Sequence, residues 1–271
     1  MSRIFTVIAH ARSGSTLLCR KLDERAEGRV YLELFHRNLK TIFNHLADSG
    51  AAVRDRFAPL DGAELRDHLA AHPMALLHLL SELNGGRDIY FKVFPGHLAR
   101  PQLQEVLANS AGAILLHRNL LHSFLSNEIA QARQKWTNDD TSKDTVAFDP
   151  KRFAGNVRTV LNFYDEMEEL LTETGTPRTD ILYETIADPD RADAAVTAAL
   201  EALGVTSAKQ PPPKGRLNRQ DSRRLASDKV SNPDEMLALL DAIGLTRAND
   251  GDTPVAKPVF AAALKALRAR S

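Results

Sequence analysis

The chain has 271 residues, and its 35 lysines and arginines balance its 35 aspartates and glutamates, so the formal net charge is zero. This balance argues against broad binding to nucleic acid or to an anionic membrane surface, and we expect neither as a partner. The single cysteine, Cys19, excludes an internal disulfide, and the lack of a signal-peptide pattern or a membrane-length apolar run favours a cytoplasmic location.

The first element is an apolar, β-branched run at residues 3–9, which predicts a buried strand. Small polar residues follow it, and Leu17, Leu18 and Leu22 then repeat at helical spacing. A strand, a tight turn and a helix start together form an anion site, because free backbone N–H groups and the positive helix end face the turn. The sequence therefore predicts that this turn binds a phosphate.

The residues of the turn narrow the kind of phosphate. In nucleoside-triphosphate loops the last glycine is followed by a lysine and a hydroxyl residue. Here Gly14 is followed by Ser15 and Thr16, and the cation, Arg12, lies two residues before the glycine. A later strand ends in the basic residues 117–118, where kinases and NTPases need an acidic metal ligand. We therefore expect a phosphate site without a triphosphate–magnesium unit, and no metal.

Further along the chain, strands alternate with helical patterns. Apolar runs predict strands at residues 88–94, 113–117 and 180–183. The patterns typical of helices fall at residues 38–47, 63–83, 101–108, 120–135, 153–171, 233–243 and 259–268. This alternation predicts the α/β class, with a central parallel sheet flanked by helices on both faces.

Three segments lack periodicity. Residues 137–150 are polar and acidic and are predicted to form a flexible loop or lid. Residues 207–231 combine three prolines with several cations, and residues 249–258 are typical of a linker. With no internal repeat, we interpret residues 1–271 as one domain decorated by these loops.

Three motifs in this order resemble the sulfotransferases that use 3′-phosphoadenosine-5′-phosphosulfate (PAPS). Residues 12–17 look like their 5′-phosphosulfate loop, and Arg118 with Ser126 matches the spacing of the pair that grips the 3′-phosphate. Tyr183-Glu184 followed by Asp188-Pro189 is similar to a third family motif. The resemblance covers about residues 4–224 and is closest to bacterial carbohydrate sulfotransferases of the trehalose 2-sulfotransferase type.

The resemblance implies a P-loop-type fold, PAPS as cofactor with PAP (adenosine 3′,5′-bisphosphate) as product, and metal-independent transfer of a sulfuryl group to a small-molecule or carbohydrate hydroxyl. It leaves open whether the protein is a homodimer. The late basic segment, residues 207–231, looks like the family's loop that closes over the cofactor. The residues that the resemblance assigns to the cofactor are Arg12, Ser13, Gly14, Ser15, Thr16, Arg118, Ser126, Tyr183, Lys214, Arg216 and Arg219.

The resemblance also implies a catalytic group, in which Arg12 faces the leaving group and Lys92 adds a second positive charge. One branch of the family uses a histidine two residues after that lysine, but Phe94 stands there and His97 follows three residues later. The carbohydrate branch uses a glutamate after the first helix, where this chain has Glu33. A carboxylate base needs a raised pKa or tight geometry. We favour Glu33 over His97 as the base.

Two other interpretations stay open. One is a P-loop kinase or NTPase, against which the absent lysine and the basic strand end count. The other is a non-catalytic module that binds a nucleotide. For Tyr183, packing in a buried position is as compatible with the sequence as a contact to the nucleotide. The acceptor pocket is expected to come from residues 38–83 and 137–150.

Overall fold

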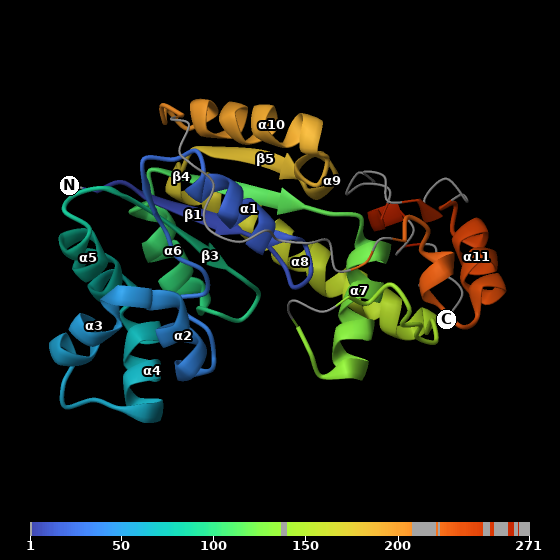
Figure 1. Cartoon of the computed structure of the whole chain (residues 1–271), viewed down its shortest axis with the longest axis horizontal. Helices are drawn as coiled ribbons and strands as arrows, with labels where there is room; N and C mark the ends of the chain where they lie inside the picture. Colours follow the sequence, from blue (N-terminus) through green and yellow to red (C-terminus); the bar gives the residue numbers. More distant parts are fainter. Residues whose placement is uncertain are drawn as a thin grey trace.

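The computed structural model describes residues 2–136, 140–207, 221, 223–245, 250–251, 260–262 and 265. A five-stranded sheet forms its centre, in the order β2-β3-β1-β4-β5, and every neighbouring pair is parallel (Figure 1). The predicted α/β class with a parallel sheet is confirmed. The strands are β1 (Ile4–Ile8), β2 (Gly28–Val30), β3 (Asp88–Val93), β4 (Gly112–His117) and β5 (Arg178–Leu182).

Helices cover both faces of the sheet and extend beyond its edges (Figure 1). They are α1 (Ser15–Asp23), α2 (Leu39–Leu46), α3 (Gly50–Arg56), α4 (Gly62–Ala71), α5 (Pro73–Leu83), α6 (Arg100–Ala108), α7 (Leu120–Arg133), α8 (Pro150–Thr174), α9 (Tyr183–Ile186), α10 (Pro189–Ala202) and α11 (Pro233–Ala242). Two short 3₁₀ turns, Ala47–Ser49 and Ser227–Lys229, complete the described elements. No helix in the described ranges is both long and apolar enough to cross a membrane.

The two-residue period of the strands divides the core into two layers. On β1, Ile4 and Ile8 pack with α5, α6 and α8, whereas Phe5 and Val7 face α1 and α10. The same alternation on β3 sends Phe91 to the first layer. Both faces of the sheet are therefore buried, as expected for parallel strands.

Several helices differ from the prediction, and α3 and α9 have no predicted counterpart. Residues 63–83 form two helices, α4 and α5, because Pro73 lacks an N–H and begins a new helix after His72. The helix α10 was not predicted, although Asp188 accepts a hydrogen bond from the Asp190 N–H as its N-cap. The predicted helix at residues 259–268 lies mostly outside the described residues.

Candidate functional site

The loop between β1 and α1 has the form that an anion site needs. Gly14 is the N-cap of α1 with φ of 88°, and as a glycine it supplies no capping side chain. Arg12 also has a positive φ, of 62°, which turns the chain sharply before the glycine. Because Gly14 has no side chain to cap the first N–H groups of α1, they and the positive end of the helix are directed at whatever occupies the loop.

The ring of Tyr183 packs against Gly14 of this loop. A Cβ atom on Gly14 would overlap the Tyr183 ring, so only glycine allows this close approach. The guanidinium of Arg118 lies over the same ring, 4.1 Å from its centre. Tyr183 is buried and begins α9 instead of ending β5. The structure thus places the Tyr183 ring against both Gly14 and Arg118.

Replacing Gly14 by alanine is expected to destabilise the fold more than the same change at Gly86. Gly86 has φ of +81° and nothing within 4 Å of a new Cβ, so Gly86→Ala measures the backbone strain alone, about 1 kcal/mol. Gly14→Ala adds the overlap with Tyr183, worth roughly a further 1–3 kcal/mol. Urea unfolding of both variants checks this. Equal losses would show that the Tyr183 contact carries no energy.

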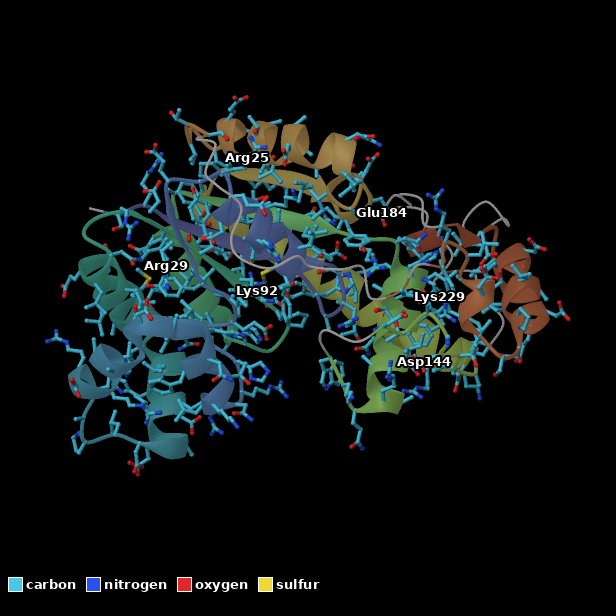
Figure 2. The ribbon with its side chains drawn as sticks, in the orientation of Figure 1. Arg25, Arg29, Lys92, Asp144, Glu184 and Lys229 are labelled. Carbon is cyan, nitrogen blue, oxygen red and sulfur yellow. The ribbon has the colours of Figure 1, made fainter. Side chains whose placement is uncertain are left out.

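Lys92 joins the loop to the segment after β2. It follows Tyr90 at the two-residue period of β3, so its side chain points towards α1, and it is 2% exposed (Figure 2). Its Nζ atom lies 3.4 Å from Ser15 Oγ and 3.2 Å from Thr16 Oγ1. The same atom lies 3.1 Å from Glu33 Oε1. The buried charge is therefore paired, as a lysine in this position requires.

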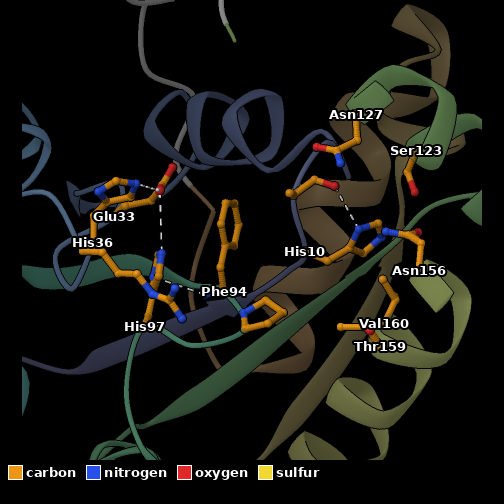
Figure 3. A pocket seen from close by; sticks show the side chains of 13 residues that line it. His10, Glu33, His36, Phe94, His97, Ser123, Asn127, Asn156, Thr159 and Val160 are labelled. Carbon is orange, nitrogen blue, oxygen red and sulfur yellow. Dashed lines mark hydrogen bonds and ion pairs between the residues drawn. The ribbon is translucent and has the colours of Figure 1, made fainter. Parts of the chain in front are cut away.

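Glu33 is the negative end of this arrangement. Its second oxygen, Oε2, lies 3.7 Å from His97 Nε2 and 3.9 Å from His36 Nε2 (Figure 3). Burial acts to raise the pKa of Glu33, but Lys92 and the two histidines outweigh it and lower that pKa. Of the two conditions that we considered for a carboxylate base, a raised pKa is therefore not met by Glu33. Tight geometry is the condition that the structure provides.

The histidines beside Glu33 have no free lone pair to offer. His97 Nδ1 accepts a hydrogen bond from the Phe94 N–H at 3.3 Å, and His36 Nδ1 accepts one from the Asn38 N–H at 2.9 Å. With Nδ1 accepting a hydrogen bond, each ring carries its proton on Nε2, the nitrogen nearest Glu33. Burial lowers the pKa of His97 to about 4, which keeps it neutral. Between the two candidates for the base, this geometry favours Glu33.

Replacing Lys92 by methionine is expected to raise the pKa of Glu33 relative to that in the unaltered protein. The Lys92 ammonium lowers the pKa of Glu33 more than either histidine does, whereas burial raises that pKa. Methionine fills similar space without charge. A titration of the carboxyl ¹³C resonance of Glu33 measures the shift. Lys92→Arg is the matched control that keeps the charge. An unchanged pKa in the Met variant would contradict the assigned ion pair.

A pocket of about 370 Å³ opens beside this group (Figure 3). Glu33, His36 and His97 form one wall, and Phe94 lies between them and His10 on the opposite side. The remaining described lining residues are Ala11, Arg37, Pro95, Ser123, Asn127, Asn156, Thr159 and Val160. The far wall thus comes from α7 and α8. No described lining residue comes from residues 38–83 or 140–150, where the sequence reading expected the acceptor pocket.

Arg118 lies at the carboxyl end of β4, next to the loop. Its Nη1 atom donates to the Arg12 carbonyl at 2.6 Å, and its Nε atom is buried without a hydrogen-bond partner in the described structure. Glu184 accepts a hydrogen bond from the Asn119 N–H at 2.8 Å and so ties α9 to the corner after Arg118. The Tyr-Glu motif therefore positions this corner, a role that the sequence did not indicate.

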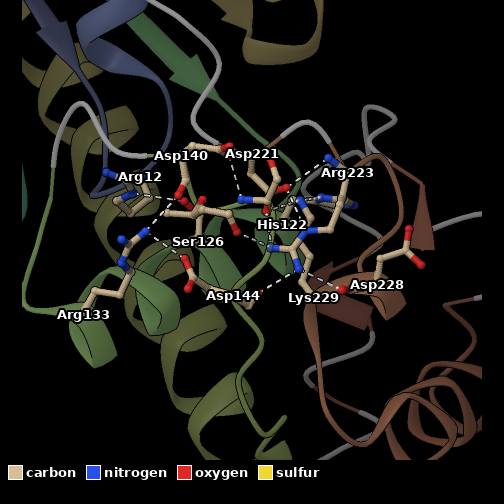
Figure 4. A network of polar contacts seen from close by, with 12 residues as sticks. Arg12, His122, Ser126, Arg133, Asp140, Asp144, Asp221, Arg223, Asp228 and Lys229 are labelled. Atoms are coloured by element: carbon tan, nitrogen blue, oxygen red, sulfur yellow. Dashed lines mark hydrogen bonds and ion pairs between the residues drawn. The ribbon is translucent and has the colours of Figure 1, made fainter.

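The Arg12 side chain makes one hydrogen bond to α7 and one to the segment that follows α7. Its Nε atom donates to Ser126 Oγ at 3.0 Å, and its Nη1 atom donates to the Trp136 carbonyl at 2.6 Å (Figure 4). Burial and the neighbouring Arg118 lower the pKa of Arg12. Ser126, which the sequence reading paired with Arg118, thus contacts Arg12 in this structure. The three residues still meet at one place beside the loop.

The described parts of the two predicted loops bind each other next to this place (Figure 4). Arg223 donates to the carbonyls of Asp144 at 2.7 Å and Thr141 at 2.8 Å. Val146 and Val230 form a parallel bridge. The segments at residues 140–150 and 223–231 are therefore tied into one unit. Lys214, Arg216 and Arg219, which were assigned to the cofactor, lie outside the described residues.

No known family model and no curated protein sequence matches the chain. Among solved structures, a sulfotransferase domain from the curacin biosynthetic pathway is similar, with a TM-score of 0.52 and 16% identity over 98% of this chain and 97% of that one. A sulfotransferase domain from the Synechococcus PCC 7002 olefin synthase has a TM-score of 0.49 and 16% identity, over 100% and 96% of the two chains. A sulfotransferase from Alicyclobacillus acidocaldarius has a TM-score of 0.47 and 15% identity, over 92% and 95%. At these identities the likeness to the curacin domain concerns the fold alone.

Proposed function

We propose that this protein is a PAPS-dependent sulfotransferase that transfers a sulfuryl group to the hydroxyl of a small molecule or carbohydrate. The observation that carries the proposal is the buried Lys92, whose ammonium contacts Glu33 on one side and the hydroxyls of Ser15 and Thr16 on the other. One cation thus links a carboxylate in a pocket to an anion-binding loop. This arrangement suits in-line transfer between an anion and a hydroxyl, which depends on positioning and charge stabilisation.

The residues around the loop suit a nucleotide with two phosphate positions. The glycine cradle and the uncapped start of α1 suit the 5′-phosphosulfate, with Arg12 beside it. Arg118 has a buried Nε donor without a partner in the described structure, which suits an anion at the end of β4. Ser126, next to Arg12, adds a hydroxyl to the same place. When bound, PAPS supplies the sulfuryl group and leaves as PAP.

In this proposal Glu33 accepts the proton of the acceptor hydroxyl, and the chain's cations stabilise the charge that develops across the loop. Lys92 connects the two events. Negative charge on the loop attracts the Lys92 ammonium. The ion pair between Lys92 and Glu33 then weakens, and the pKa of the Glu33 carboxylate rises. Glu33 therefore gains strength as a base when the proton must move. His97 and His36, each with Nε2–H near Glu33, orient the carboxylate.

Calorimetry with PAP and with ADP–Mg²⁺ tests the proposal. Binding of PAP in the presence of a chelator, at least tenfold tighter than that of ADP–Mg²⁺, is the expected result. A preference for ADP–Mg²⁺ would favour a kinase or NTPase instead. Transfer of labelled sulfate from PAPS to a hydroxyl compound then separates an enzyme from a module that only binds nucleotide. The trehalose-type acceptor, a homodimer and the cytoplasmic location stay predictions from the sequence.

Replacing Arg118 by alanine is expected to abolish the discrimination between PAP and AMP. The unaltered protein should bind PAP at least tenfold more tightly, because a partly buried phosphate without its cation is costly. The variant should bind both nucleotides weakly and with similar affinity, as measured by calorimetry. If the variant keeps the preference, the 3′-phosphate binds elsewhere, and Lys214, Arg216 and Arg219 become the candidates.

A further inference from the structure

The wall of the pocket opposite Glu33 contains a buried imidazole with a lone pair to offer. His10 is 3% exposed, and its Nδ1 atom lies 3.0 Å from the Ala11 carbonyl oxygen. A carbonyl oxygen only accepts hydrogen bonds, so Nδ1 carries the proton. Burial, helped by Arg118, lowers the pKa of His10 to about 4, and the ring is neutral. Its Nε2 atom is therefore a hydrogen-bond acceptor.

Asn156, which lies beside His10, carries a second unpaired acceptor. His10 Nε2 and Asn156 Oδ1 are both buried atoms without a hydrogen-bond partner in the described structure. Both residues line the pocket, and Figure 3 shows them side by side on the wall formed with α8. Leaving such acceptors unpaired in a buried place costs free energy. A molecule that donates hydrogen bonds to them would remove this cost.

The opposite wall has the reverse polarity. His36 and His97 hold their lone pairs against backbone N–H groups and turn Nε2–H towards Glu33. Of the three histidines that line the pocket, His10 alone presents a lone pair on Nε2. The pocket therefore has a carboxylate on one side, suited to the reacting hydroxyl, and a pair of neutral acceptors on the other.

We propose that His10 and Asn156 form a subsite that binds a second donor group, a hydroxyl or an amine, of the molecule whose hydroxyl Glu33 deprotonates. The inference rests on the proposed function. It makes the substrate a diol, a polyol or an amino alcohol and disfavours simple alcohols and phenols. A single hydroxyl satisfies only one wall of the pocket and leaves the acceptors on the other unpaired, so discrimination of tenfold or more is expected.

The first test uses the full chain labelled with ¹⁵N-histidine and saturated with PAP. Cyclohexanol, trans-cyclohexane-1,2-diol and myo-inositol are the probes, because they share a six-membered ring and differ in hydroxyl number. A hydrogen bond donated to Nε2 of His10 moves its ¹⁵N resonance upfield. The diol and inositol should produce this shift at concentrations at least tenfold below that of cyclohexanol. A resonance that none of the probes moves indicates a resident water only and overturns the proposal.

The second test uses a matched pair of variants at the same position. In His10→Asn the amide N–H₂ still reaches the Ala11 carbonyl, but the acceptor at Nε2 is lost. In His10→Gln the side-chain oxygen reaches the place of Nε2. The ratio of kcat/KM for the diol over cyclohexanol should fall at least tenfold in the Asn variant and in Asn156→Leu, and should largely persist in the Gln variant.

The two proposals fail differently. If PAP binds and sulfate is transferred but His10→Asn leaves the ratio unchanged, the subsite is wrong and the function stands. If PAP does not bind and nothing is sulfated, while the diol still shifts Nε2 of the unloaded protein, the donor-binding subsite stands and the function is wrong. Thermal unfolding of the three variants confirms that they are folded, and the resonance test on the unaltered chain does not depend on them.

Discussion

Replacing Glu33 by glutamine is expected to lower the rate of sulfuryl transfer by about 10²–10⁴-fold, the usual contribution of a general base. Glutamine keeps the size and the hydrogen-bonding shape of the side chain but has no lone pair basic enough to take the proton. Glu33 lies 3.1 Å from the Lys92 ammonium, which contacts Ser15 and Thr16 of the β1–α1 loop on its other side, so any change in the affinity for PAP should be much smaller than the loss of rate. Turnover of PAPS with a saturating acceptor and calorimetry with PAP measure the two quantities.

The pH dependence of the same variant is an independent check. Because Lys92 and the histidines lower the pKa of Glu33, its carboxylate stays ionised through the neutral range. The rate should therefore fall only as the pH drops through that lowered pKa, and this acidic limb should vanish in the Gln variant. His97→Ala is the comparison, and its loss should be much smaller. If the Glu33→Gln enzyme is active and the His97→Ala enzyme is inactive, then His97 and not Glu33 is the general base.

Replacing Arg12 by alanine is expected to cost about a hundredfold or more in rate, while PAP binding weakens less. A fixed guanidinium that meets leaving-group charge mainly in the transition state is worth roughly 3–4 kcal/mol. Arg12 is held in place by Ser126 at 3.0 Å and by the Trp136 carbonyl at 2.6 Å. Single-turnover transfer from PAPS and calorimetry with PAP separate the two effects.

Two further variants control for position and charge. Arg12→Lys keeps the charge but not the fork of donors, so it should recover part of the rate. Ser126→Ala removes one anchor of the guanidinium and leaves its charge, and its effect should lie between those of the unaltered protein and Arg12→Ala. A near-native turnover in Arg12→Ala would contradict the role of this residue at the leaving group.

The sequence alone was sufficient for features that depend on neighbouring residues. Short apolar runs predicted four of the five described strands within a few residues, because a buried strand needs only such a run. The small polar turn before Leu17 predicted the loop, since a strand, a glycine and a helix start are contiguous. The strand of three residues at Gly28–Val30 and the alanine-rich helix Pro189–Ala202 escaped, because neither has a marked apolar period.

Only the tertiary structure decided which side chains meet. Tyr183 packs on Gly14 across 169 positions of the chain, and Arg12, not Arg118, takes Ser126. The partners of Lys92 follow from the register of β3 beside β1, which no local pattern specifies. The hydrogen-bonding states of His10 and His97 depend on which backbone group each ring meets. These contacts depend on strand order and helix placement, so the sequence could propose residues for the site but could not identify their partners.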